Sequence, residues 1–147
     1  MEVQAQIMAR RETALERLAK VPLLRECSKK ELDIIARLTT TIFVEAGATL
    51  LIEGTFAREM MIVVEGTASV HRHGVKVAEI GPGAVVGELG LLTGHPRNAS
   101  VVTDTKMELL VLASAEFSAL LDDVPSVTRK ILNTLAMRLA EAEHPSS

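Results

Sequence analysis

The chain has 147 residues, enough for one domain with a sizeable buried core. With 48% hydrophobic residues and three phenylalanines as its only aromatics, it is not an intrinsically disordered chain, and its core is predicted to be aliphatic. The net charge of −3 gives no electrostatic footprint for nucleic acid, and no apolar run reaches the length of a membrane span. Because Cys27 is the only cysteine and no signal-peptide core is found, we expect a cytoplasmic protein without an internal disulfide.

Two helices are predicted at the N-terminal end. Over residues 3–20 the apolar positions fall near one face of a helix, and Pro22 ends the pattern. Ser28 followed by Glu31 is typical of a capping box, which predicts a second helix over residues 29–38.

The character of the sequence changes at residue 40. Val, Ile and Thr then occur in short runs separated by glycine, which is typical of strands and turns. The predicted strands cover residues 41–45, 49–53, 59–65, 67–73, 75–80, 99–103 and 106–112. Many short strands without long helices between them predict a closed or sandwiched antiparallel roll. A hairpin at residues 71–76 would place Val70 and Val77 on the same interior face.

Helical patterns return after residue 113. Residues 115–121 are predicted to form a short helix capped by Ser114, and Pro125 fits the first turn of a long helix that ends near Glu143. The fold class is therefore α+β, a jelly-roll-like antiparallel β-roll flanked by N-terminal helices and a C-terminal helix pair. We expect a single domain over residues 1–147, with helices in 1–38, the roll in 40–113 and helices in 115–143.

Several motifs that carry chemistry are missing or incomplete. The segment GPGAVVG at residues 81–87 matches neither nucleotide-binding glycine fingerprint and is better explained by turns. His71 and His73 would share a strand face, but two histidines do not complete a metal site. No nucleophile with a base is identifiable, so we expect neither an enzyme nor a bound metal or cofactor.

The most informative segment is GELGLLTGHPRNASV, residues 87–101. Arg97 is the only arginine between Arg72 and Arg129, and apolar sequence flanks the segment on both sides. A guanidinium in apolar surroundings needs an anionic partner, because an unpaired buried charge is costly. The partner is either Glu88, in a structural salt bridge, or a ligand.

The residue types of this segment suit two different parts of one ligand. Gly87 allows a ligand close to the backbone, and the fork of Arg97 can hold two oxygens of a phosphate. Asn98 and Ala99 directly follow Arg97, so their backbone amides could contact the same phosphate. Glu88 only accepts hydrogen bonds, which suits a hydroxyl such as a ribose 2′-OH. Beside a wall of Val70, Val77 and Val86, these groups describe a nucleotide site, with the salt bridge as an equal alternative.

The segment resembles the phosphate-binding cassette of the cyclic nucleotide-binding domain family. The family pattern is G-E-(L/I)-(A/G)-L-L, a short loop, then P-R-x-A-x-V, and residues 87–92 and 96–101 match it. The resemblance extends more weakly over nearly the whole chain. It implies that Arg97 and the amides of Leu89, Asn98 and Ala99 bind a cyclic phosphate, and that Glu88 and Gly87 bind the ribose.

The resemblance also implies how the base is held. Val70, Val77 and Val86 would contact sugar and base, and Arg138 or Glu143 of the last helix would cover the base. The family commonly has Ala, Ser or Thr at the position of Asn98. A hydroxyl there often accompanies guanine recognition, so its absence favours cAMP over cGMP.

By this resemblance the chain is a cAMP-binding regulatory module whose helices dock differently once the ligand is bound. It would act on a protein effector or a fused domain, without nucleic acid and without membrane insertion. Two alternatives remain: a ligand-free interaction or scaffold domain of the same fold, and an excised regulatory domain of a larger enzyme, channel or transcription factor. Four residues follow Glu143, so we expect no helix-turn-helix.

Overall fold

The computed structural model describes residues 15–21 and 24–143, without the side chains of Glu88, Leu89, Leu92, Arg138, Ala142 and Glu143. Of the helix predicted over residues 3–20, residues 3–14 lie outside the described part and residues 15–19 are helical. The chain divides into two compact units, residues 39–116 and residues 1–38 together with 117–147. Each unit is described separately below.

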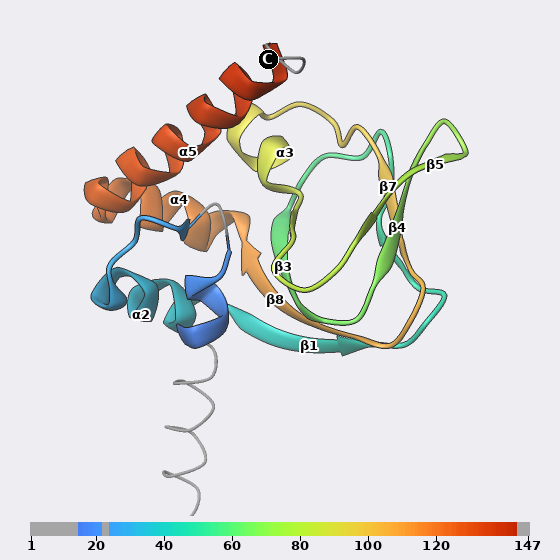
Figure 1. Cartoon of the computed structure of the whole chain (residues 1–147), viewed down its shortest axis with the longest axis horizontal. Helices are drawn as coiled ribbons and strands as arrows, with labels where there is room; N and C mark the ends of the chain where they lie inside the picture. The colour runs from blue at the N-terminus through green and yellow to red at the C-terminus, as the bar shows by residue number, and fades with distance from the viewer. Residues whose placement is uncertain (1–14, 22–23, 144–147) are drawn as a thin grey trace, which may run out of the picture. The chain divides into compact units, whose positions relative to one another are not determined.

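The unit of residues 39–116 is an antiparallel β-roll (Figure 1). One sheet has the strand order β1-β8-β3-β6 and the other β2-β7-β4-β5. The elements are β1 (Thr40–Val44), β2 (Thr49–Leu51), β3 (Glu59–Glu65), β4 (Ala68–Arg72), β5 (Val75–Ile80), β6 (Val85–Val86), the short helix α3 (Glu88–Thr93), β7 (Ser100–Thr103) and β8 (Met107–Ala113). The predicted fold class is confirmed, and the seven predicted strands match β1–β5, β7 and β8.

The core of the roll is aliphatic, as the composition predicts. It is built from Leu51, Met61, Val63, Ala68, Val86, Val101, Met107 and Leu109. Two of the three phenylalanines, Phe43 and Phe56, are exposed at the surface of this unit. Burial of the aliphatic side chains on the inner faces of both sheets supplies the driving force for closing the roll.

The β4–β5 hairpin differs from the prediction in its register. A bulge between Val70 and His71 places Ala78 opposite Val70. Val77 is therefore not the partner of Val70, and its side chain is 52% exposed. The extra residue of a bulge reverses the faces of the positions that follow it, which the alternation of residue types does not show.

The other unit is helical and joins both ends of the chain. It contains α2 (Lys29–Leu38), most of α4 (Ser114–Asp123) and α5 (Pro125–Glu143). The predicted capping box is confirmed, because the Ser28 amide donates to Glu31 Oε1 at 2.7 Å and the Glu31 amide donates to Ser28 Oγ at 3.1 Å. Pro125 begins α5, as expected for a first-turn proline. No helix in the described part of the chain is both long and apolar enough to cross a membrane.

Glu31 connects α2 to α5 through hydrogen bonds. Its carboxylate accepts from Lys130 Nζ at 2.5 Å and from Ser126 Oγ at 2.5 Å. These bonds from Lys130 and Ser126, together with those from Ser28, lower the pKa of Glu31 from 4.5 to about 2. The charged carboxylate thus links α2 to α5, and the Glu31 side chain is only 10% exposed.

We expect Glu31→Gln to lower the free energy of unfolding by about 1–3 kcal/mol at pH 7, because the hydrogen bonds from Lys130 and Ser126 lose their charged acceptor. A lowered folded-state pKa stabilises the fold above the ordinary value of 4.5. That contribution is lost as the pH falls from about 4.5 toward 2, so the gap between wild type and variant should close over this range. Urea unfolding at several pH values measures this difference in the free energy of unfolding.

Asp33→Asn, which breaks the exposed Arg37–Asp33 pair, is the matched control and should cost less than about 0.5 kcal/mol. A gap that persists at pH 2 would contradict the role of the charge.

Candidate functional site

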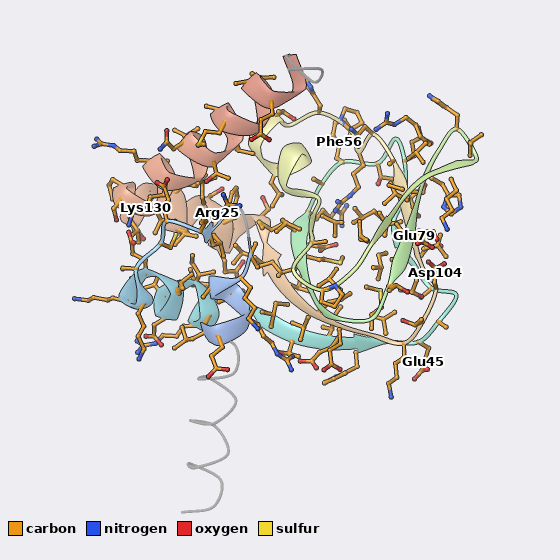
Figure 2. The ribbon with its side chains drawn as sticks, in the orientation of Figure 1. Arg25, Glu45, Phe56, Glu79, Asp104 and Lys130 are labelled. Atoms are coloured by element: carbon orange, nitrogen blue, oxygen red, sulfur yellow. The ribbon has the colours of Figure 1, made fainter. Side chains whose placement is uncertain are left out.

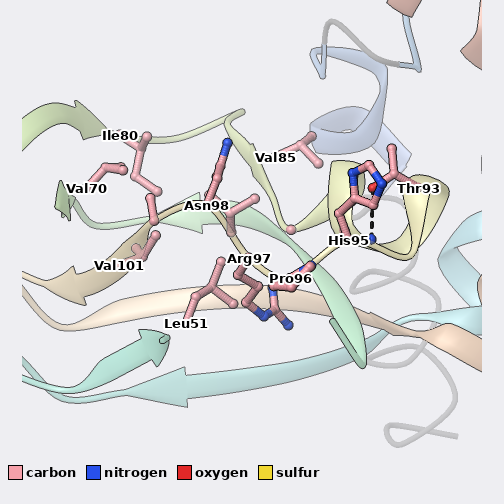
Figure 3. Close-up of a pocket in the computed structure, with 14 residues that line it drawn as sticks. Leu51, Val70, Ile80, Val85, Thr93, His95, Pro96, Arg97, Asn98 and Val101 are labelled. Carbon is pink, nitrogen blue, oxygen red and sulfur yellow. Dashed lines mark hydrogen bonds between the residues drawn. The ribbon is translucent and has the colours of Figure 1, made fainter. Parts of the chain in front are cut away.

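The β-roll contains a pocket of about 500 Å³ beside α3 (Figure 3). Its walls come from the strands and from the segment of residues 87–101. The strand residues are Leu51, Val70, Ile80, Val85, Val86 and Val101, and the segment contributes Gly87, Gly90, Thr93, His95, Pro96, Arg97, Asn98 and Ala99. The pocket therefore has an aliphatic side, made by both sheets, and a polar side, made by the cassette.

The backbone of Arg97 is held by the loop between β2 and β3. The Gly54 amide donates to the Arg97 carbonyl at 2.8 Å, and the Arg97 amide donates to the Thr55 carbonyl at 2.7 Å. Phe56 and Pro96 form a β-bridge beside these bonds. The position of Arg97 is thus set by a strand-like pairing with a loop that precedes it by about 40 residues in the chain.

The guanidinium of Arg97 is buried but incompletely bonded. Its side chain is 7% exposed, Nη2 donates to the Glu59 carbonyl at 3.3 Å, and Nη2 lies 3.9 Å from the Glu59 carboxylate. Nη1 is buried and has no hydrogen-bond partner among the described residues. Burial lowers the pKa of Arg97, and the negative charge of Glu59 acts in the opposite direction. A buried cation with unused donors is suited to an anionic ligand.

Gly87 lies directly against this guanidinium. Its φ of +88° is left-handed, and a Cβ built on it would lie 2.7 Å from Arg97 Nη1 and 2.9 Å from the Glu59 carbonyl oxygen. Any other residue would therefore collide with the arginine or the backbone of β3. Glycine at this position allows the cassette to approach Arg97 closely.

Adjacent side chains of the cassette point to different parts of the pocket. Figure 3 shows Arg97 beside Leu51 and Pro96, with the Asn98 amide pointing the opposite way, toward Ile80 and Val85. The amide of His95 donates to Thr93 Oγ1 at 3.2 Å, which fixes the turn after α3. The site thus offers a cation at one end and an amide beside aliphatic side chains at the other.

The structure brings together most of the residues predicted for the site. Val70, Val86, Gly87, Arg97, Asn98 and Ala99 all line the pocket. Val77 does not line it, because the hairpin bulge turns it outward. Glu88 and Leu89 form the first turn of α3, with side chains outside the described part. Arg138 and Glu143 belong to α5, and their side chains are also not described, so their roles remain predictions.

Sequence reasoning missed several lining residues and the acidic neighbour of Arg97. Leu51, Ile80 and Val101 lie in predicted strands, and the pairing of Leu51 with Val101 across β2 and β7 could have marked them as wall residues. Glu59 opens β3, far from the cassette in sequence, and only the fold places it beside Arg97. No local signal in the sequence identifies that contact.

The two histidines of the hairpin do not form the arrangement expected from the sequence. β4 ends at Arg72, and His73 lies in the turn with a φ of +52°. His73 instead contacts Glu53, whose carboxylate accepts a hydrogen bond from its amide at 3.0 Å. In the part of the chain that the structure describes, no group of three or more His, Cys, Asp or Glu side chains could hold a metal ion.

A pocket inside a β-roll, with aliphatic strand residues on one side and a buried, under-bonded arginine on the other, is suited to a small anionic molecule. The family model described as "Cyclic nucleotide-binding domain" matches residues 41–124. The chain therefore belongs to the cyclic nucleotide-binding domain family, whose fold is regulatory rather than catalytic.

The curated relatives are longer proteins of several kinds. The chain is 38% identical over 100 residues to the Pycsar effector protein XpPycTIR of Xanthomonas perforans, covering 67% of this chain and 33% of that protein. It is 35% identical over 125 residues to the cyclic nucleotide-gated potassium channel mll3241 of Mesorhizobium japonicum, covering 85% and 35%. It is 32% identical over 113 residues to a cAMP-dependent protein kinase regulatory subunit of Eremothecium gossypii, covering 76% and 25%. The chain thus spans a quarter to about a third of these relatives.

Solved structures agree with this assignment. A cyclic nucleotide-binding domain from Methylobacillus flagellatus KT is 25% identical, with a TM-score of 0.77, and the match covers 94% of this chain and 80% of that one. The match includes the β-roll and flanking helices, which supports the same architecture here.

Proposed function

We propose that the chain is a regulatory module that binds cAMP in the pocket of the β-roll. The observation that carries this proposal is the buried Arg97 guanidinium, whose Nη1 has no partner among the described residues and lies beside Gly87 on the polar side of the pocket. A cyclic phosphate supplies two oxygens to such a fork, and the Arg97–Glu59 separation of 3.9 Å is too long to satisfy it.

In this proposal, different residues of the cassette bind different parts of the ligand. Arg97 and the amides of Leu89, Asn98 and Ala99 bind the phosphate, and Glu88 with Gly87 binds the ribose. Val70 and Val86 contact sugar and base, with Arg138 or Glu143 over the base. The choice of cAMP is supported by the likeness to a cAMP-dependent protein kinase regulatory subunit and by Asn98, which offers an amide and no hydroxyl.

The output of the module is proposed to be a change in helix docking, passed to a fused domain or a protein effector. The relatives carry their matching region within much longer chains, which supports an effector of this kind. The ligand can shift the docking only through its different affinity for the two states.

Titration calorimetry with cAMP and cGMP side by side tests the proposal. We expect binding of both to be measurable and cAMP to bind more tightly. Thermal unfolding with and without each nucleotide gives an independent readout, because a ligand that binds the folded state raises the melting temperature. No heat and no shift with either nucleotide would favour a ligand-free interaction domain.

The ribose contact gives a sharper prediction. We expect 2′-deoxy-cAMP to bind about 5- to 30-fold more weakly than cAMP, because the Glu88 carboxylate loses its hydroxyl donor. In Glu88→Ala the two nucleotides should bind about equally. The double comparison by calorimetry forms a thermodynamic cycle for this one contact. If Glu88→Ala still prefers cAMP over 2′-deoxy-cAMP as wild type does, another group binds the 2′-OH.

A further inference from the structure

Arg97 lies between two hollows of the β-roll. On one side, Nη1 faces Gly87 and the ligand pocket. On the other side, Nη2 faces Glu59, and both residues line a second hollow of about 480 Å³. Besides these two, the second hollow is lined by Leu50, Leu51, Ile52, Thr55, Phe56 and Arg58. Arg97 therefore borders the ligand pocket and the second hollow at once, while Nη2 contacts Glu59.

The present contacts leave the charge of Arg97 poorly satisfied. A guanidinium carries five N–H donors, and the described structure gives its side chain a single hydrogen bond of 3.3 Å to the Glu59 carbonyl. In the described part of the chain, Glu59 supplies the one carboxylate within ion-pair distance, at 3.9 Å. Charge-assisted bonds are shorter, at about 2.7–2.9 Å. Glu59 thus lowers the cost of burying the cation without forming a close ion pair.

We infer that Glu59 is the counter-ion of Arg97 in the empty site, and that an anionic ligand binds by replacing it in that role. The inference rests on the proposed function, because the incoming anion is the phosphate of the nucleotide. Glu59 can give up the contact easily, since its side chain is 37% exposed and borders the second hollow. Glu59 is therefore a residue that sets affinity without touching the ligand.

Counter-ion replacement makes two predictions of opposite sign. Without the Glu59 carboxylate the buried cation loses its one counter-ion among the described residues, so the stability of the empty protein falls. The bound protein keeps a counter-ion, the phosphate, and no longer has a second negative charge nearby, so ligand binding becomes more favourable. A residue that only supports the local structure would lower stability and affinity together.

Glu59→Gln is the variant that isolates the charge, because it keeps the size of the side chain and the backbone carbonyl that binds Nη2. We expect a lower melting temperature than wild type without ligand, and about 3- to 10-fold tighter cAMP binding by calorimetry. Glu45→Gln is the matched control, since it removes the same charge from an exposed residue at the end of the roll away from Phe56 (Figure 2). The control should leave the melting temperature unchanged and should change cAMP affinity by less than about 2-fold.

Glu59→Asp keeps the charge and should bind cAMP as wild type does, within about 2-fold. Weaker or unchanged binding by Glu59→Gln, or equally tight binding by Glu59→Asp and Glu59→Gln, would overturn the inference. If the wild-type protein binds no cyclic nucleotide, the proposed function fails and the stability comparison alone decides. A Glu59→Gln protein as stable as Glu45→Gln would then refute the counter-ion role.

Discussion

Arg97→Lys is expected to weaken cAMP binding by about 2–4 kcal/mol, or roughly 30- to 1,000-fold. Lysine keeps the positive charge but has one compact ammonium in place of a planar fork. In the structure the guanidinium uses Nη2 for the Glu59 carbonyl, and Nη1 has no hydrogen-bond partner among the described residues. The three donors of a lysine ammonium sit on one nitrogen, so they cannot reproduce the spread of a planar fork that contacts the Glu59 carbonyl with one nitrogen and a phosphate with another.

Calorimetry with cAMP measures the loss, and the far-UV circular dichroism spectrum checks that the variant remains folded. Arg58→Lys is the control, because Arg58 is an exposed arginine next to Glu59 and does not line the ligand pocket. It should change affinity by less than about 2-fold. Unchanged binding by Arg97→Lys would mean that the buried arginine serves the fold rather than the ligand.

The cassette could be predicted from the sequence because its chemistry is local. Gly87, Glu88, Pro96 and Arg97 lie within eleven consecutive positions, and their residue types alone indicate a close approach, an acceptor and a phosphate fork. The structure supports this for Arg97, which is buried and has an unpaired Nη1 in its described surroundings. The bounds of β3 and β5 could be predicted for the same reason, because runs of Val, Ile and Met between glycines are visible locally.

The parts that the sequence did not predict depend on pairing between distant segments. β6 has only two residues, Val85 and Val86, which is too short for any periodic pattern, and it is a strand only because it pairs with β3. The predicted hairpin and the family resemblance place Val77 in the pocket wall beside Val70, and the bulge after Val70 turns Val77 outward. Glu59 meets Arg97 across 38 positions of the chain. Register and long-range contact are properties of the folded sheet, which local residue types do not encode.

The β4–β5 hairpin and Glu59 show that residues outside the cassette motif also shape the site. The same cassette on a roll without Glu59 would lack the one carboxylate that the described residues place within ion-pair distance of Arg97, and we expect its affinity for an anion to differ. The motif therefore predicts what class of ligand is bound, and the surrounding strands set how tightly. Variation outside the cassette is where differences in affinity between relatives are expected to arise.

Gly87→Ala is expected to lower the free energy of unfolding by about 2–3 kcal/mol and to reduce cAMP affinity at least tenfold. Two effects add at this position. Alanine at a φ of +88° is strained, and its Cβ would lie 2.7 Å from Arg97 Nη1 and 2.9 Å from the Glu59 carbonyl oxygen. Relief of the contact with Nη1 requires the guanidinium to move, which displaces the group that is proposed to bind the phosphate.

Gly83→Ala separates these two effects. Gly83 has nearly the same φ, +90°, but a Cβ there would meet no atom within 4 Å. It should therefore show only the backbone cost, about 1–2 kcal/mol, with cAMP affinity within about 2-fold of wild type. Urea unfolding and calorimetry on both variants give the comparison. If Gly83→Ala and Gly87→Ala lose the same stability and bind cAMP equally well, then contact between Gly87 and Arg97 does not shape the site. A loss of affinity confined to Gly87→Ala means that the phosphate site depends on a backbone position that can carry no side chain.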